Sequence, residues 1–271
     1  MRFWVIILMI AVAGRAAGAI APGDSTRQFL WPDKHYIKSY LTDSKDILTS
    51  CKSWNSKQWI TAGSSIAITS VLFTQDQHIR EFAQNHRTDF SNSVSSNFLE
   101  PFGSVEDKPY TVIGLAGLYG YGLLVKDLRA QAASMNAAKA FILAGISVQI
   151  IKFSFGRARP YSNQGSFDWF NNPLDVQNLS FMSGHTMATF AVASSLAHSY
   201  PEKKWLGILV YSIAGLTGLS RIHDDQHWAS DVFAGALLGY YIGSFTGKSS
   251  RWQLGVSQVD SKPVACMIYQ F

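Results

Sequence analysis

Apolar residues gather in six segments of the chain, and polar or charged residues fill the stretches between them. Each segment is rich in Ala, Leu, Ile and Gly, and none alternates apolar and polar residues with a period of two, so the pattern predicts helices rather than strands. The segments cover roughly residues 58–75, 109–125, 130–155, 185–198, 204–220 and 228–246. We therefore expect an all-α protein with one helical bundle of about six core helices.

The N-terminus has the pattern of a secretory leader. Residues 1–19 combine Arg2, an apolar run and a final Ala17-Gly18-Ala19, which is typical of a signal peptide. An uncleaved anchor is the alternative, although Arg15 cuts the apolar run below the roughly 20 residues that a membrane span needs. We expect export to the cell envelope, with an N-terminal segment over residues 20–57 before the helical domain.

The C-terminal residues 248–271 do alternate apolar and polar positions. Asp260-Ser261-Lys262-Pro263 is a plausible turn in the middle, so this tail predicts a short β-hairpin after a helical domain over residues 58–247. The hairpin either caps the bundle or presents an edge to another envelope component. In an oxidising compartment Cys51 and Cys266 could pair, but two cysteines without a C-x-x-C spacing indicate little more.

Composition narrows the possible partners. Apolar residues make up 47% of the 271 positions, enough for a sizeable core, and only 15% are charged. The formal net charge of +5 fits a phosphate-bearing partner, but no basic run is interleaved with aromatics, so nucleic acid is not expected. The mean hydropathy of +0.05 is low for six membrane spans. We expect a periplasmic bundle that rests on a membrane surface, with an integral bundle as the alternative.

Polar clusters stand at three junctions between the predicted helices. Neighbouring helices of an up-down bundle are antiparallel, so the end of the third helix, the start of the fourth and the junction of the fifth and sixth all lie at one end. These junctions read KFSFGRARP, MSGH and SRIHDDQHWASD. Ionisable groups beside a core are costly unless they are paired, so the three clusters predict a single functional site.

The charges of these clusters suit an anion. Lys152, Arg157, Arg159 and Arg221 bring positive charges together, and phosphate is the anion that best matches planar guanidinium groups. Ser183-Gly184-His185 precedes an apolar helix, so Ser183 is a natural N-cap beside free backbone N–H groups. Arg157 is equally well explained as a partner in a salt bridge.

Two histidines are candidates for the chemistry. His227 and Asp231 are four residues apart at the start of the sixth helix, so the carboxylate can accept from one ring nitrogen and leave the other free as a nucleophile. His185, across the site, can protonate a leaving group. A metal site formed by His223, His227 and Asp231 is a rival, but a dication would have to bind among several fixed cations.

The neighbouring ionisable residues have simpler interpretations. For His223 we favour a satisfied structural histidine, and for Asp224 and Asp225 a pairing with nearby arginines. The stretch from 76 to 108 mixes aromatic and charged residues, and we expect a long loop that lines the substrate entrance, or else a structural loop over the bundle end.

The three motifs resemble the signature of the type 2 phosphatidic acid phosphatase and vanadium haloperoxidase superfamily. In that order they are Lys152 with Arg159-Pro160, then Ser183-Gly184-His185, then Ser220-Arg221 with His227 and Asp231. Met182 stands where the family usually has proline. The resemblance covers roughly residues 110–246 and implies an acid phosphatase/vanadium haloperoxidase-like bundle.

The resemblance also implies a role for each motif residue. His227 would attack phosphorus to form a phosphohistidine, Asp231 would orient it, and His185 would protonate the leaving oxygen and later activate water. The phosphoryl oxygens would be held by Lys152, Arg159, Ser183, Gly184 and Arg221. Such a site needs no metal and no cofactor, and vanadate would bind to it as a phosphate mimic.

We therefore expect a metal-independent phosphatase. Its substrate would be a phosphorylated lipid, of the phosphatidate or prenyl diphosphate type, or a small phosphate ester. Two alternatives remain open: a vanadate-dependent haloperoxidase, whose pocket uses the same residues, and a non-catalytic anion-binding protein of the envelope, which would need no nucleophile.

Overall fold

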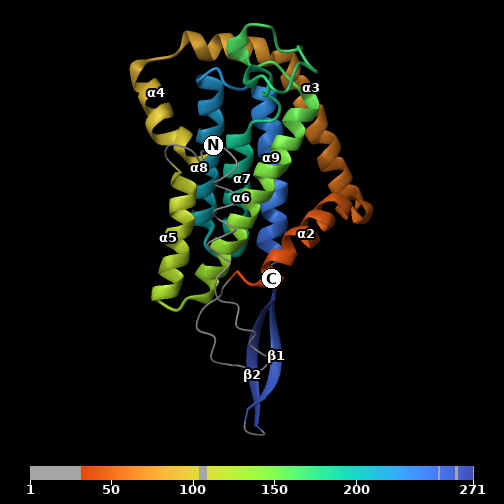
Figure 1. Ribbon diagram of the computed structural model, residues 1–271, viewed down its shortest axis with the longest axis vertical. Helices are drawn as coiled ribbons and strands as arrows, with labels where there is room; N and C mark the ends of the chain where they lie inside the picture. The colour runs from red at the N-terminus through yellow and green to blue at the C-terminus, as the bar shows by residue number, and fades with distance from the viewer. Residues whose placement is uncertain (1–31, 104–108, 250, 260–261, 271) are drawn as a thin grey trace.

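The computed structural model describes residues 32–103, 109–249, 251–259 and 262–270, and most of them form a helical bundle (Figure 1). The predicted signal peptide lies outside the described residues. The six helices expected from the apolar pattern are confirmed as α3 (Ser56–Asn85), α5 (Tyr110–Leu124), α6 (Leu128–Phe155), α7 (Gly184–Ser199), α8 (Lys204–His223) and α9 (Ala229–Ser249). Two shorter helices, α2 (Lys34–Thr49) and α4 (Asp89–Val94), were not expected.

The prediction of a long loop over residues 76–108 was wrong. Helix α3 continues to Asn85, and after α4 the chain forms a π turn at Ser95–Leu99 and a 3₁₀ turn at Glu100–Phe102. In Figure 1 this orange to gold part of the chain crosses the upper end of the bundle. The sequence TQDQHIREFAQN is polar enough to resemble a loop, but its polar residues follow a helical spacing, as the site shows below.

Helix α7 lies at the centre and packs against α6, α8 and α9. The main core cluster joins apolar side chains of α6, α7 and α9, namely Ala140, Leu143, Ala144, Val148, Met187, Ala191 and Ile242. Several of these are alanines, so the helix axes approach closely and the relative position of the helices is tightly determined.

Glycines at every fourth position of α9 bring it against α7. A Cβ atom added at Gly235 would lie 2.8 Å from the carbonyl oxygen of Ser183, and one added at Gly239 would collide with the carbonyl of Met187. Gly243 and Gly247 meet Ala191 and Ser195 in the same way. The missing side chains of these glycines therefore allow the two helices to pack closely. This contact sets the start of α9 directly beside the start of α7.

Helix α2 is held on the bundle by a buried ion pair. The Nζ of Lys139 on α6 lies 2.8 Å from Oδ2 of Asp43 and donates to Oγ of Ser39 at 2.6 Å. The ammonium also lies over the ring of Tyr36, 5.2 Å from its centroid. A buried charge is tolerated only when it is paired and hydrogen-bonded in this way.

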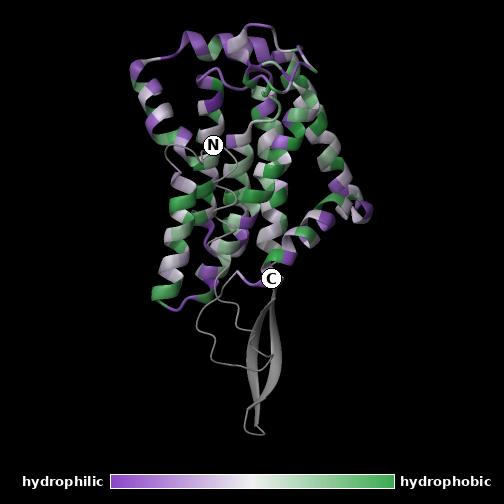
Figure 2. Ribbon diagram, in the orientation of Figure 1, coloured by the Kyte–Doolittle hydropathy of each residue, from purple (hydrophilic) through white to green (hydrophobic). Residues whose placement is uncertain are grey.

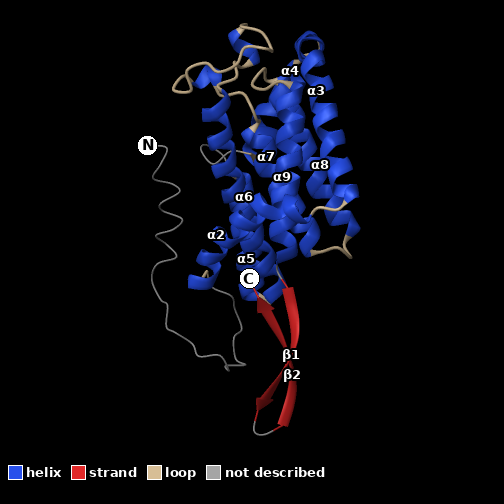
Figure 3. Cartoon of the chain, turned by 90° about the vertical axis from the view of Figure 1, so that its right-hand side faces the viewer, coloured by secondary structure: helices blue, strands red, loops and turns tan. Residues whose placement is uncertain are grey.

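The C-terminal residues form two antiparallel strands, β1 (Arg251–Val259) and β2 (Lys262–Gln270), which extend away from the end of the bundle where α9 stops (Figure 3). Val259 lies opposite Lys262 in the pairing. Residues 260–261 of the predicted turn lie outside the described residues, as does the side chain of Cys266. Cys51 is exposed, and its pairing with Cys266 stays a prediction.

Hydrophobic residues recur along all the helices of the bundle (Figure 2). Two helical segments, Leu128–Ser162 and Lys204–His223, are long and apolar enough to cross a membrane. Large exposed side chains on the outer helices include Ile60, Ile66, Val71, Ile113, Leu124, Ile146, Ile150, Trp205, Ile208, Leu216 and Leu219.

Candidate active site

The polar clusters of the three motifs lie at one end of the bundle, as their helix junctions predict. This is the upper end in Figure 1, opposite the strands. Lys152 lies in the last turn of α6, Ser183 is the N-cap of α7, and Arg221 lies in the last turn of α8. His227 precedes α9, and Asp231 is in its first turn.

Direct contacts join these junctions. The backbone N–H of Ser183 donates to the carbonyl oxygen of Asp231 at 3.1 Å. The Nζ of Lys152 lies 3.8 Å from the place of a Cβ atom at Gly184, so the ammonium sits against the first turn of α7. A side chain at Gly184 would fill the space between that ammonium and the helix N-terminus, where backbone N–H groups attract anions.

Arg159 follows α6 in an extended stretch. Gly156 ends the helix in the left-handed region, with φ of 50°, and a Cβ atom there would collide with the carbonyl of Asn171. The backbone N–H of Arg159 donates to Gln177 at 2.7 Å, and its Nη1 donates to Gln226 at 2.5 Å. Within the described part of the chain, the buried Nε of Arg159 has no hydrogen-bond partner. This donor therefore remains free for a ligand oxygen.

His185 lies among the cations of the site. Burial lowers its pKa well below the usual 6.5, and the charges of Arg221, Lys152 and Arg159 lower the pKa further, as does His227. Each of these groups is thus within electrostatic reach of the His185 ring. In the ligand-free state the imidazole is neutral, because the fixed cations disfavour an imidazolium.

His227 is almost fully buried, with 3% of its surface exposed. Burial lowers the pKa of His227 to about 3, although Asp231 opposes the shift. Its Nδ1 lies 3.9 Å from Oδ2 of Asp231, which is longer than a hydrogen bond. The carboxylate therefore lies on the Nδ1 side of the ring, without the expected hydrogen bond, and Nε2 is on the other side.

The Asp231 carboxylate is held by donors on both oxygens. Oδ2 accepts from Oγ of Ser180 at 2.6 Å and from the backbone N–H of Trp228 at 3.0 Å, and Oδ1 accepts from Arg157 at 2.5 Å. Burial raises the pKa of Asp231, but Arg157, His227 and Ser180 outweigh burial and lower it below its usual value. The group is therefore ionised at neutral pH.

Arg221 is buried and engaged by two carboxylates. Its Nη2 lies 2.7 Å from Oδ2 of Asp224, and its Nη1 lies 3.2 Å from Oε1 of Glu100. Glu100 comes from the segment that was predicted to be a loop, and it is 45% exposed. An anion that binds Arg221 would compete with this exposed carboxylate.

The remaining ionisable residues of the α8–α9 junction pair as the simpler interpretations predicted. Asp224 binds Arg221, and Asp225 forms a two-pronged ion pair with Arg80 at 2.7 Å from each oxygen. Both ring nitrogens of His223 have hydrogen-bond partners 2.9 Å away, in Asp224 and Ser91. In the part of the chain that the structure describes, no group of three or more His, Cys, Asp or Glu is placed to hold a metal ion.

Arg157 differs from the other three cations of the predicted anion site. It is fully buried, and its guanidinium bridges Asp231 to Asp76 of α3, with Nη2 to Oδ2 of Asp76 at 2.7 Å. The interpretation as a salt-bridge partner is confirmed. The sequence analysis missed Asp76 because it stands outside the three motifs. The available signal is the spacing of Asp76, Arg80 and Gln84 at i, i+4 and i+8, which places all three on one face of α3.

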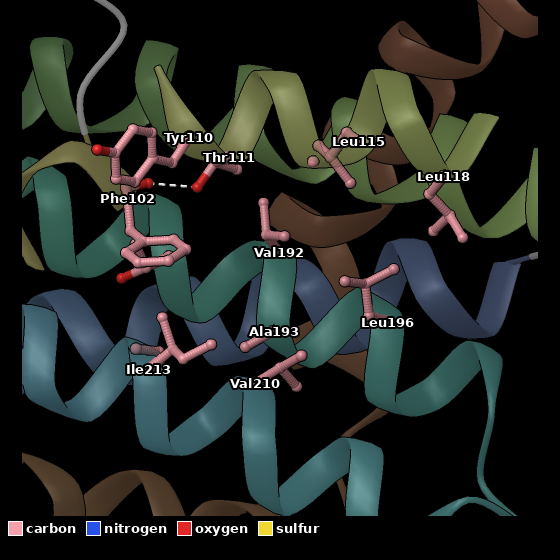
Figure 4. A pocket seen from close by; sticks show the side chains of 13 residues that line it. Phe102, Tyr110, Thr111, Leu115, Leu118, Val192, Ala193, Leu196, Val210 and Ile213 are labelled. Atoms are coloured by element: carbon pink, nitrogen blue, oxygen red, sulfur yellow. Dashed lines mark hydrogen bonds between the residues drawn. The ribbon is translucent and has the colours of Figure 1, made fainter. Parts of the chain in front are cut away.

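An apolar groove begins beside the site. It lies between α5, α7 and α8, has a volume of about 220 Å³, and is lined by Phe102, Thr111, Leu115, Leu118, Val192, Leu196 and Ile213 (Figure 4). Phe102 precedes Gly103, whose missing side chain leaves room for His185. Thr189, which also lines the groove, donates to the backbone carbonyl of His185 at 2.9 Å. The groove thus adjoins the histidine that faces the cations.

Comparison with known proteins assigns this architecture to a family. Residues 133–253 match the model of the PAP2 superfamily. The segment that carries the three motifs therefore belongs to this superfamily. The matched segment contains every predicted site residue, whereas Asp76 lies before it. The individual roles predicted for these residues are not tested by the match and stay predictions.

Curated relatives share part of the chain. A lipid A 1-phosphatase from Porphyromonas gingivalis is 28% identical over 66% of this chain and 35% of the relative. An undecaprenyl-diphosphatase from Sulfolobus acidocaldarius is 31% identical over 38% of this chain and 48% of the relative. The chain thus spans between about a third and a half of these two proteins. The crystal structure of LpxE from Aquifex aeolicus is 22% identical, with a TM-score of 0.46, over 63% of this chain and 93% of that one.

Proposed function

We propose that this chain is a metal-independent phosphatase that hydrolyses phosphate monoesters or diphosphates of lipids through a phosphohistidine. The observation that carries the proposal is the meeting of two histidines with Lys152, Arg159 and Arg221 at one end of the bundle, where a carboxylate lies beside the ring of His227. His227 is flanked by a carboxylate, and His185 is surrounded by cations. The names of the two curated relatives support a phosphorylated lipid as the class of substrate.

The first step transfers the phosphoryl group to His227. Nε2 of His227 donates its lone pair to phosphorus while the bond from phosphorus to the leaving oxygen breaks. The bound phosphate dianion favours the imidazolium form of His185, which gives its proton to that oxygen, so the alcohol leaves neutral. The cations and the N–H groups at the start of α7 stabilise the equatorial oxygens of the transition state, where negative charge is concentrated.

The second step returns the enzyme to its starting state. Neutral His185 takes a proton from water as the water oxygen attacks phosphorus, and the bond from phosphorus to Nε2 of His227 breaks. Inorganic phosphate leaves, and the proton that His185 took from water is released once the cations of the site are again without an anion. Positive charge develops on the His227 ring while it carries the phosphoryl group, and the Asp231 carboxylate stabilises that charge.

The apolar groove supports a lipid rather than a small soluble ester. Its lining is apolar apart from the hydroxyl groups of Tyr110, Thr111 and Thr189, and it starts beside His185. A hydrocarbon chain that entered it would hold the phosphate end at the cations. The exposed apolar faces of the outer helices likewise support association with a membrane, from which such a substrate would come.

The proposal is tested by phosphate release from purified protein in the presence of a chelator. Phosphatidate, a prenyl diphosphate and p-nitrophenyl phosphate serve as substrates for the unaltered chain, His227→Ala and His185→Ala. We expect release that collapses in both variants and persists in the matched control His78→Ala, an exposed histidine of α3. Labelled phosphate should be trapped on the protein in an acid-labile form, and His227→Ala should trap none.

Other results of these assays would favour one of the two alternative functions. Halide oxidation in added vanadate without release of phosphate would favour a haloperoxidase. Binding of phosphate without turnover of any substrate would favour a non-catalytic protein. Carbonate extraction of membranes separates the two forms of association: release of the chain excludes an integral bundle, and retention excludes a peripheral one.

A further inference from the structure

Arg157 joins two carboxylates that come from opposite sides of the site. Its Nη1 donates to Oδ1 of Asp231 at 2.5 Å, and its Nη2 donates to Oδ2 of Asp76 at 2.7 Å. All three side chains have no exposed surface. Nε and Nη2 also donate to the carbonyl oxygen of Ser166, so the guanidinium has a single orientation.

Aromatic rings enclose the same guanidinium. Its central carbon lies 4.8 Å from the ring centroid of Phe73, 4.7 Å from that of Trp169 and 5.5 Å from that of Trp228. These rings exclude water from the ion pairs, which strengthens the electrostatic interaction between Arg157 and each carboxylate. A change in the charge of one member of this group would therefore have a strong electrostatic effect on Asp231.

Asp76 also fixes the first turn of α9. Its Oδ1 accepts from the backbone N–H of Ser230 at 2.9 Å, and its Oδ2 accepts from Oγ of Ser230 at 2.5 Å. Ser230 in turn accepts from Nη1 of Arg157 at 2.8 Å. The carboxylate of Asp76 thus fixes the backbone between His227 and Asp231. It also neutralises part of the positive charge of Arg157, which binds Asp231.

We propose that Asp76 and Arg157 are positioning residues of the phosphoryl-transfer site, which keep the Asp231 carboxylate aimed at His227 and leave it enough negative charge to stabilise the His227 imidazolium. The inference rests on the proposed function for its catalytic consequence. Arg157 divides its charge between two carboxylates, so Asp231 is only partly neutralised. Without the charge of Asp76, the arginine would act on Asp231 alone.

The decisive variant is Asp76→Asn, which keeps the shape and the acceptor for the Ser230 N–H but removes the charge. We expect kcat on p-nitrophenyl phosphate to fall about 10- to 100-fold, while KM and the inhibition constant of inorganic phosphate change less than about threefold. Phosphate is held by cations that this variant leaves in place. Asp231→Asn should lower kcat as well, and adding Asp76→Asn to it should lower kcat little further, because the two changes act through one carboxylate.

Asp225→Asn is the matched control. It also removes a carboxylate that ties an arginine of α3 to the α8–α9 junction, and asparagine tolerates the positive φ of 59° at this position. Among the described residues, Asp225 has no hydrogen bond to Asp231. We expect kcat to stay within about twofold of the unaltered chain.

A spectroscopic measurement separates this inference from the proposed function. The ¹⁵N resonances of the His227 ring, assigned with His227→Gln, should differ between the unaltered chain and Asp76→Asn and should not change in Asp225→Asn. Failure of the unaltered chain to release phosphate would reject the proposed function while leaving this readout intact. Unchanged His227 resonances in Asp76→Asn, or equal losses of kcat in Asp76→Asn and Asp225→Asn, would overturn the positioning role.

Discussion

The backbone N–H of Ser183 donates a 3.1 Å hydrogen bond to the carbonyl oxygen of Asp231. This bond joins the start of α7 to the start of α9, although the two residues belong to separate motifs. One turn further along α9, the absent side chain of Gly235 allows the Ser183 carbonyl to approach. Backbone contacts therefore help to hold the proposed nucleophile, His227, beside the proposed anion-binding turn at Ser183.

Gly235→Ala should separate these two elements. The new Cβ atom would lie 2.8 Å from the Ser183 carbonyl oxygen, so α9 must shift. We expect a loss of about 1–3 kcal/mol in the free energy of unfolding and a lower kcat. Gly145→Ala is the control, because a Cβ atom there meets nothing within 4 Å and alanine favours the helix. Thermal unfolding and phosphate release check both, and equal behaviour of the two variants would contradict the role of this contact.

Acid should destabilise the fold partly through His227. Burial lowers its pKa from 6.5 to about 3 in the folded chain. Between these two pH values the unfolded chain binds more protons at His227 than the folded chain does. The contribution of neutral His227 to the free energy of unfolding is therefore fully present above pH 6.5 and is lost as the pH falls toward 3. Thermal unfolding measured from pH 7 to pH 4 should show a smaller decline of Tm in His227→Gln. Parallel declines in the two proteins would refute a neutral buried imidazole.

Phosphate binding should raise the pKa of His185. In the free site, burial and the surrounding cations hold this pKa well below 6.5. A bound phosphate dianion neutralises those cations and favours the imidazolium, which is the form that can protonate a leaving group. The site should then take up a proton as phosphate binds, and affinity for phosphate should fall as the pH rises.

Histidine NMR titrations with and without inorganic phosphate measure this shift, with His185→Gln for assignment. The exposed His86 ring, which contacts the Phe82 carbonyl, serves as an internal reference. An upward shift of the His185 titration alone is expected. A His185 titration that phosphate leaves in place would remove this histidine from the role of acid.

The bundle and the meeting of the three motifs follow from simple properties of the sequence. Apolar segments of helical length give the helices, and antiparallel packing puts Lys152, Ser183 and His227 at one end. Spacing within one helix also predicted that Asp231 faces His227. These inferences depend only on periodicity and on the order of the helices, which a sequence shows directly.

The parts that could not be predicted depend on contacts between distant residues. Nothing within the motif of Arg157 indicates that its partner is Asp76, 81 positions earlier. The end of α3 was predicted to be a loop because Asp76, Arg80 and Gln84 contact the α8–α9 junction with polar side chains, where an apolar stripe would have indicated a helix. The 3.9 Å separation of His227 and Asp231 likewise reflects competition for the carboxylate by Ser180, Trp228 and Arg157.

A larger side chain in the apolar groove should discriminate between substrates. Gly114 of α5 lines the groove, and a Cβ atom there meets nothing within 4 Å, so Gly114→Leu adds bulk to the groove at a position with room for its Cβ atom. We expect kcat/KM for a long-chain phosphatidate to fall about tenfold, because the hydrocarbon chain loses the space that it occupies. Release from p-nitrophenyl phosphate, which has no such chain, should not change.

Gly117→Leu supplies the control on the same helix. A Cβ atom at Gly117 also meets nothing within 4 Å, but this residue is outside the lining of the groove. Gly117→Leu should therefore add the same apolar surface and the same change in helix propensity as Gly114→Leu, without filling the groove. Equal kinetics of the two variants on phosphatidate would show that the chain of the substrate lies elsewhere. Selective loss in Gly114→Leu would instead place that chain between α5, α7 and α8, with its phosphate end directed toward His185.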